Sequence, residues 1–148
     1  MNEDTKLTWL KRVLIFKILV VALLWGLPTL LGPEPFLRML GEEIPDPPFY
    51  MRIFGATQIG LVFLYWLAYQ NPSRNRDMIR YAVWDNSVAF LTIVGYAVTV
   101  GITNPTVWLS AVLVLFFAIA FYVLTPRPVE GSQPSQGAVE KSQTSVTL

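Results

Sequence analysis

The stretch "RYAVWDNSVAFLTIVGYAV" (Arg80–Val98) decides the fold class of this chain, because it is a long apolar run with a carboxylate inside it. About 20 apolar residues cross the ~30 Å hydrocarbon core of a bilayer as a helix. Asp85 lies near the start of the run, next to Asn86. Charged side chains within a membrane span are costly and usually face the interior of a helix bundle. The stretch therefore predicts a transmembrane helix with one polar face.

The composition of the whole chain also indicates a membrane protein. Of 148 residues, 53% are hydrophobic and only 14% are charged, against roughly 25% charged residues in soluble domains. Four runs have spanning length: Leu10–Leu31, Tyr50–Tyr69, Arg80–Gly101 and Pro105–Leu124. They should be helices, because lipid cannot satisfy free backbone polar groups. We predict an all-α integral membrane protein with an up-down bundle of four transmembrane helices in residues 1–125.

The first run could instead be a secretory signal, but a lysine interrupts it at Lys17 and no A-x-A-like cleavage site follows, so we expect a retained helix. Lysine and arginine then set the orientation. With a cytoplasmic amino terminus, nine of them lie inside: Lys6, Lys11, Arg12, Lys17, Arg74, Arg76, Arg80, Arg127 and Lys141. Only Arg38 and Arg52 lie outside. This positive-inside bias predicts that both termini are cytoplasmic.

The first outer loop, residues 32–49, has the pattern of a short interfacial helix. Pro33 and Pro35 can open it and Gly41 can close it. Its apolar side chains are Phe36, Leu37, Met39 and Leu40. The helix should lie along the outer membrane surface as a lid on the bundle. The loop also carries Glu34, Glu42, Glu43 and Asp46, but without the ligand spacing of a calcium loop. We therefore expect a solvated acidic face and no metal.

Much of the usual enzyme chemistry is excluded, because the chain has no cysteine and no histidine. It cannot supply a thiol nucleophile, a disulfide, a Cys/His zinc site, a haem-ligating histidine or a Ser-His-Asp triad. The net charge of +1 gives no basic field for nucleic acid. No catalytic residue and no cofactor are expected from the sequence.

The second run contains a candidate helix-packing seam. Gly55, Ala56 and Gly60 are small, and Ala56 and Gly60 have the small-xxx-small spacing that lets helices approach closely. Gln58 should donate its amide across this seam. Arg52, at the outer end, should snorkel to lipid head groups or meet Glu42 or Glu43.

Polar residues in three of the runs predict a site inside the bundle, consisting of Lys17, Asp85, Gln58, Asn86, Thr92 and Tyr96. Counted at ~1.5 Å per residue from the cytoplasmic ends of their helices, Lys17 lies about 10 Å deep in the membrane and Asp85 about 7 Å deep. Because these depths are similar, a direct ion pair between the two side chains is expected. Alternatively, Lys17 snorkels to the inner head groups and Asp85 is capped by Asn86, Ser87 or Tyr81.

The order of parts resembles the DoxX-like group of small four-helix membrane proteins. The resemblance rests on the proline-containing outer loop ending in Leu40-Gly41, on "RIFGA" (Arg52–Ala56) and on the polar turn "NPSRNR", and covers about residues 33–101. The Gly and Lys that better-defined members have after the first helix are not recognisable here. The resemblance implies the cytoplasmic membrane of a bacterium or archaeon. Some members resemble accessory subunits of membrane redox complexes, and no functional residue carries over.

After Thr125 the chain becomes rich in Pro, Ser, Gln and Gly, which predicts a disordered cytoplasmic tail over residues 126–148. Three functions stay open. The first is a non-enzymatic module that packs against itself or a larger membrane assembly. The second is a small transporter or a binder of a lipophilic ligand, such as a lipid or a quinone, with a polar site around Asp85. The third is a lipid-modifying enzyme, which lacks an evident second catalytic group.

Overall fold

The structure, a computed structural model, describes residues 2–39, 41 and 44–126. These residues form only helices: α1 (Glu3–Val20), η1 (Val21–Gly26), α2 (Leu27–Leu31), α3 (Glu34–Met39), α4 (Phe49–Gln70), α5 (Arg76–Val100) and α6 (Pro105–Leu124). Four helical segments are long and apolar enough to cross a membrane: Glu3–Leu31, Phe49–Gln70, Arg76–Val100 and Pro105–Leu124. The predicted all-helical class with four candidate spans is confirmed. The predicted tail beyond Pro126 and residues Leu40, Glu42 and Glu43 lie outside the described residues.

The first span is continuous but not uniform, because α1 passes through the π-helical turn η1 into α2. The Leu27 N–H donates to the carbonyl of Ala22, five residues back. Pro28 follows directly. Proline has no N–H to donate and its ring crowds the carbonyl four residues earlier, so a wider turn just before it relieves the clash. Such π-helical turns frequently occur at functional sites.

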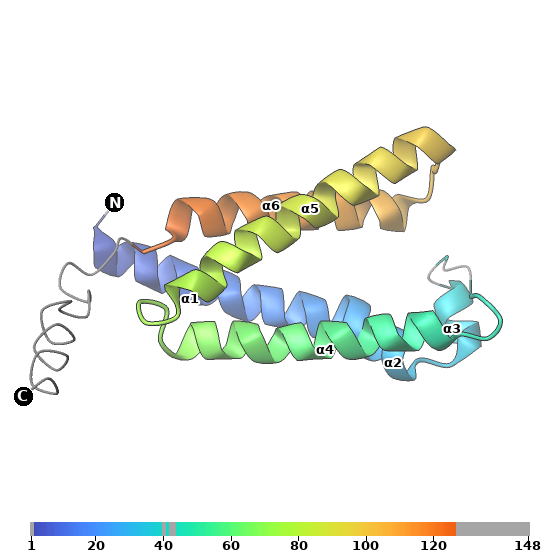
Figure 1. The fold of residues 1–148 in the computed structure, drawn as a ribbon, viewed down its shortest axis with the longest axis horizontal. Helices are drawn as coiled ribbons and strands as arrows, with labels where there is room; N and C mark the ends of the chain where they lie inside the picture. The colour runs from blue at the N-terminus through green and yellow to red at the C-terminus, as the bar shows by residue number, and fades with distance from the viewer. Residues whose placement is uncertain (1, 40, 42–43, 127–148) are drawn as a thin grey trace, which may run out of the picture.

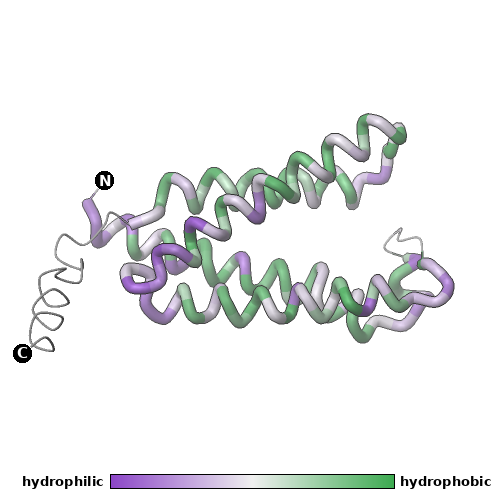
Figure 2. Tube along the Cα trace, in the orientation of Figure 1, coloured by the Kyte–Doolittle hydropathy of each residue, from purple (hydrophilic) through white to green (hydrophobic). Residues whose placement is uncertain are grey.

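The four spans form two pairs (Figure 1). The first span packs along α4, and α5 packs along α6. The pairs meet at the end of the molecule that carries the 71–75 turn, where α1 also packs against α6, and they diverge toward the other end. We call these the closed end and the open end. Hydrophilic segments gather at the two ends of the long axis, with mostly apolar helix between them (Figure 2), as expected for a chain that crosses a membrane lengthwise.

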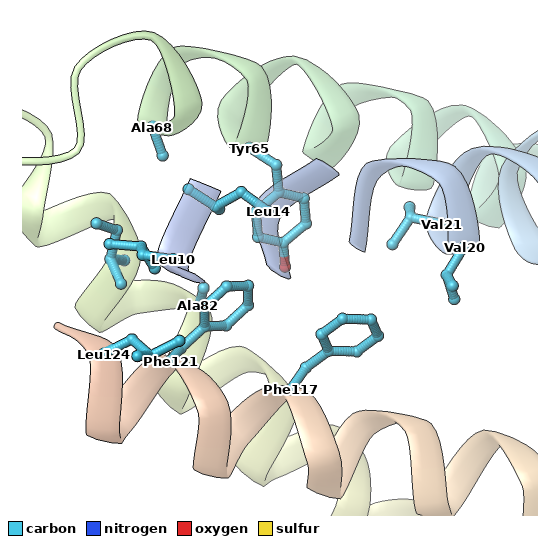
Figure 3. Packing of buried hydrophobic residues seen from close by; sticks show 11 residues of the cluster. Leu10, Leu14, Val20, Val21, Tyr65, Ala68, Ala82, Phe117, Phe121 and Leu124 are labelled. Atoms are coloured by element: carbon cyan, nitrogen blue, oxygen red, sulfur yellow. The ribbon is translucent and has the colours of Figure 1, made fainter. Parts of the chain in front are cut away.

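The buried core fills the closed half of the bundle. Figure 3 shows Tyr65 reaching from α4 toward Phe117 and Phe121 of α6. The Tyr65 and Phe121 rings stack with centroids 6.2 Å apart, and those of Phe117 and Phe121 are 6.0 Å apart. Leu10 and Leu14 of α1 are fully buried beside them. Close packing of this kind holds helices together where lipid replaces water.

The helix-packing seam differs in part from the expected one. Gly55 is buried against α2, and a methyl group there would lie 2.5 Å from the Leu30 backbone nitrogen and 2.7 Å from Thr29 Oγ1. Ala56 is exposed, and a methyl group on Gly60 would meet no atom within 4 Å. The small-xxx-small pair therefore points away from the seam, because one face of a helix cannot hold Gly55 together with its neighbour Ala56.

At the open end, the outer loop contains α3 and joins α2 to α4 within the first helix pair. Gly41, with φ of +80°, ends α3, and its N–H donates to the carbonyl of Arg38 at 3.0 Å. The left-handed conformation there favours glycine. The carbonyl of Gly41 accepts a hydrogen bond from the Asn104 side-chain amide at 3.1 Å. Since Asn104 precedes α6, this bond ties the outer loop to the α5–α6 pair.

Arg52 at the start of α4 completes the end of the first span. Its Nη1 donates to the carbonyls of Thr29 and Gly32, at 3.0 and 2.9 Å. The last carbonyls of a helix have no partner within the helix, and a cation suits the negative end of the helix dipole. Arg52 thus has a capping role that the sequence did not predict, because the carbonyls of α2 lie within reach of α4; its alternative partners Glu42 and Glu43 lie outside the described residues.

Candidate functional site

A cleft of about 450 Å³ lies between the two helix pairs where they diverge, and all four spans line it. We call it the central cleft. Its polar lining consists of Lys17, Gln58, Asp85, Asn86, Thr92, Thr106 and Ser110. Its apolar lining includes Val21, Trp25, Phe54, Leu61, Ala89 and Val114. Along α6 it extends from Thr106 to Val114, which is ~12 Å at the rise of an α-helix. Its size and mixed lining are typical of small-molecule sites.

Lys17 lies at the end of the central cleft that adjoins the buried core. The side chain is only 3% exposed, and its Nζ donates to Asn86 Oδ1 at 2.7 Å. Asn86 is itself buried, and its Nδ2 donates to the carbonyl of Ala82 at 2.6 Å. This second bond fixes the amide of Asn86 with its oxygen toward Lys17.

Three aromatic rings surround the ammonium group of Lys17. Nζ lies 4.5 Å from the ring centroid of Phe117, 5.5 Å from that of Trp25 and 5.6 Å from that of Tyr65. Aromatic faces attract cations, most strongly when the cation is shielded from water. The rings and Asn86 together hold a buried positive charge without a carboxylate in contact.

The expected ion pair between Lys17 and Asp85 is not formed. In the described part of the chain, ion pairs join Lys6 to Glu3, Arg38 to Glu34 and Arg80 to Asp77. Asp85 Oδ2 instead accepts a hydrogen bond from the Tyr65 hydroxyl at 3.3 Å. Successive residues of a helix point ~100° apart, so Asn86 rather than Asp85 faces Lys17.

The alternative expectation for these two residues differs from the structure as well. Lys17 is buried and does not extend to a surface. Ser87 does not cap Asp85 and donates to the carbonyl of Val83 on its own helix, at 2.7 Å. The carboxylate is therefore held by Tyr65 of α4, which is not among the residues predicted for the site.

Of the six residues predicted for the site, five line the central cleft: Lys17, Gln58, Asp85, Asn86 and Thr92. Tyr96 is 63% exposed and does not line it, because α5 has diverged from α4 at that height. Trp25 and Ser110 also line the cleft and were missed. The feature of the sequence that could have indicated Trp25 is Pro28, because a proline favours a wider helical turn just before it and Trp25 lies in that turn.

Several polar groups of the central cleft have unused hydrogen-bonding capacity. Within the described residues, Gln58, Thr92 and Ser110 make no side-chain hydrogen bond. Lys17 has three N–H donors and uses one on Asn86. Of these three, Gln58 and Ser110 are half-buried and Thr92 is exposed. The cleft therefore offers donors, together with the Asp85 carboxylate, to a molecule that fills it.

The central cleft brings together several kinds of polar group. It holds one cation, one carboxylate, amides and hydroxyls, and no group of three metal-ligating side chains occurs in the described residues. A Ser hydroxyl is present at Ser110, but no base lies in a described hydrogen bond with it. The fold and site thus define a small helical membrane protein with a polar cleft between its spans. No protein-family model, curated protein or solved structure matches this chain.

Proposed function

We propose that this protein binds a lipophilic ligand with a polar, hydrogen-bond-accepting head group, such as a lipid or a quinone, in the central cleft. The observation that carries the proposal is the buried Lys17, which has two unused donors at the inner limit of a largely apolar cleft. An acceptor on the ligand would compensate the charge, and its apolar part would contact Val21, Leu61 and Val114.

We expect the ligand to enter the central cleft laterally from the lipid, between α4 and α5. The two helix pairs diverge at the open end, and α4 and α5 make few contacts with each other, so the cleft borders the lipid between them. The Gly41–Asn104 hydrogen bond links the outer loop to the start of α6. A lipophilic molecule can thus enter without first crossing water.

The proposal is tested by native mass spectrometry of the protein released from mild detergent. Wild type should carry one small molecule per chain, whose fragment masses identify it. Lys17→Met should lose it, whereas Lys11→Met should keep it, because Lys11 is exposed and lies over the ring of Tyr69. A wild-type chain that never carries a small molecule would falsify the proposal.

A second candidate function, a non-enzymatic subunit of a membrane assembly, is favoured by a separate observation. Gly60 of α4 and Gly95 of α5 are exposed, and a methyl group on either would meet no atom within 4 Å. Small residues on an open helix face allow a helix of another chain to approach closely. In the same mass spectra, a bound protein rather than a bound small molecule would favour this function.

We also propose that both termini are cytoplasmic, on the distribution of lysine and arginine. The chain has no native cysteine, so single cysteines can be placed without background. Ser73 of the 71–75 turn and Thr103 of the α5–α6 turn are both exposed. Ser73→Cys should react with an impermeant maleimide only from the cytoplasmic side, and Thr103→Cys only from the opposite side. The reverse pattern would invert the topology.

A further inference from the structure

A second cleft lies at the closed end, on a different side of α5 from the central cleft. It has a volume of about 510 Å³ and is lined by the start of α5 and the end of α6. We call it the basic cleft, and its residues are Arg76, Arg80, Val83, Trp84, Tyr122, Thr125 and Pro126. None of them lines the central cleft.

The order of residues along α5 matches the order of groups in a phospholipid. Arg80, Val83 and Trp84 lie four, seven and eight positions after Arg76 and so share one helix face with it. The two arginines come first, at the polar end of the span, and the apolar residues follow deeper in it. From Arg76 to Trp84 the helix rises ~12 Å, enough for a head group followed by the upper part of an acyl chain.

The guanidinium groups of the basic cleft have few partners in the protein. Arg76 is half-buried and its side chain makes no hydrogen bond or ion pair within the described residues; its Nε is buried, so its terminal nitrogens are the ones that can reach a ligand. In the described part of the chain, Arg80 is paired only with Asp77, at 3.8 Å, and the Asp77 side chain is 95% exposed. An exposed pair of this kind contributes little. Both arginines are therefore available to an anion, and the planar guanidinium group suits phosphate oxygens.

The aromatic residues of the basic cleft fit the same ligand. Trp84 and Tyr122 are 72% and 75% exposed, although both are large and lie in candidate spans. Tryptophan and tyrosine are enriched where a membrane meets water. The Tyr122 hydroxyl makes no hydrogen bond within the described residues, so it can donate to a head group.

We propose that the basic cleft binds one anionic phospholipid, with its phosphate held by Arg76 and Arg80 and an acyl chain along Val83 and Trp84. Anionic lipids attract basic segments next to a membrane span, and they are concentrated in the cytoplasmic leaflet. The site is independent of the ligand in the central cleft. It anchors the closed end of the bundle, where α5 and α6 both meet the interface.

The test uses nanodiscs of phosphatidylcholine containing a minority of phosphatidylglycerol. After release into the gas phase, the wild-type chain should retain one phosphatidylglycerol in preference to phosphatidylcholine. The double variant Arg76→Gln/Arg80→Gln should lose roughly thirtyfold in this preference, because each arginine near an anionic surface contributes roughly fivefold in affinity. Arg76→Lys/Arg80→Lys keeps the charge but not the paired donors of the guanidinium groups. Its preference for phosphatidylglycerol should lie between those of wild type and of the glutamine double variant.

A matched control separates a defined site from general attraction. Arg12→Gln/Arg74→Gln removes the same charge from exposed positions outside the cleft, and should retain the lipid. Equal losses in the two glutamine double variants would overturn the proposal in favour of diffuse electrostatics. In lipid-free detergent, inorganic phosphate should not bind measurably. Phosphate binding there, comparable to that of the lipid, would overturn it in favour of a plain anion site.

Discussion

The ammonium group of Lys17 on α1 lies 2.7 Å from the side-chain oxygen of Asn86 on α5, and this bond joins the two helix pairs within the membrane. Both residues are almost fully buried. Hydrogen bonds to charged groups contribute ~1.5–3 kcal/mol, and a charge left without its partner costs more. This contact is therefore expected to stabilise the closed half of the bundle and to limit how far the pairs diverge.

The first prediction concerns the partner of Lys17. Lys17→Met and Asn86→Leu should each lower the melting temperature in detergent, and the double variant should recover part of the loss. The coupling free energy should be about 2 kcal/mol. Asp85→Asn should couple less to Lys17→Met, because Asp85 contacts Tyr65. If Lys17→Met coupled more strongly to Asp85→Asn than to Asn86→Leu, the result would indicate that Lys17 pairs directly with Asp85.

The second prediction compares two glycines of α4. Gly55→Ala would place a methyl group 2.5 Å from the backbone of Leu30, so α2 and α4 must move apart. We expect a loss of ~1–3 kcal/mol in the free energy of unfolding. Gly60→Ala is the matched control, since nothing lies within 4 Å. It should leave the melting temperature unchanged or slightly higher. Equal behaviour of the two variants contradicts the seam at Gly55.

The third prediction concerns the cap of the first span. Arg52→Gln removes the donors to the carbonyls of Thr29 and Gly32. Amide hydrogen exchange in residues 27–32 should become faster, with a stability loss of ~1–3 kcal/mol. Arg38→Gln breaks only an exposed pair with Glu34 at 3.9 Å and should leave exchange there unaltered. Unchanged exchange in Arg52→Gln would show that α2 does not depend on this cap.

The four candidate spans were predictable because each depends only on local composition and length. The predicted Pro105–Leu124 coincides with α6, and Tyr50–Tyr69 lies one residue inside α4 at each end. The first span begins earlier than predicted, at Glu3 rather than Leu10, because the polar residues before Leu10 do not prevent a helix from continuing beyond the hydrocarbon core. The set of polar residues around the central cleft was also largely predictable, because polar side chains in a span turn inward.

The pairing within that set could not be read from the sequence. Asp85 and Asn86 are adjacent and nearly equal in depth, so choosing between them as the partner of Lys17 requires the rotation of α5 about its axis. That rotation is set by packing against α6, through contacts that no local pattern reveals. The divergence of the helix pairs, which opens the central cleft, likewise depends on crossing angles. The capping role of Arg52 depends on the approach of α2 to Gly55.

The most direct test of ligand binding in the central cleft is to fill it without removing a polar group. Ala89 lines the cleft on α5, whereas its neighbour Val88 is 57% exposed and does not. Ala89→Phe and Val88→Phe place the same ring on the same helix, one inside the cleft and one facing lipid. The measurement is the number of small molecules retained per chain in native mass spectra. We predict one for wild type and Val88→Phe and none for Ala89→Phe, while equal retention by both variants would contradict binding in this cleft.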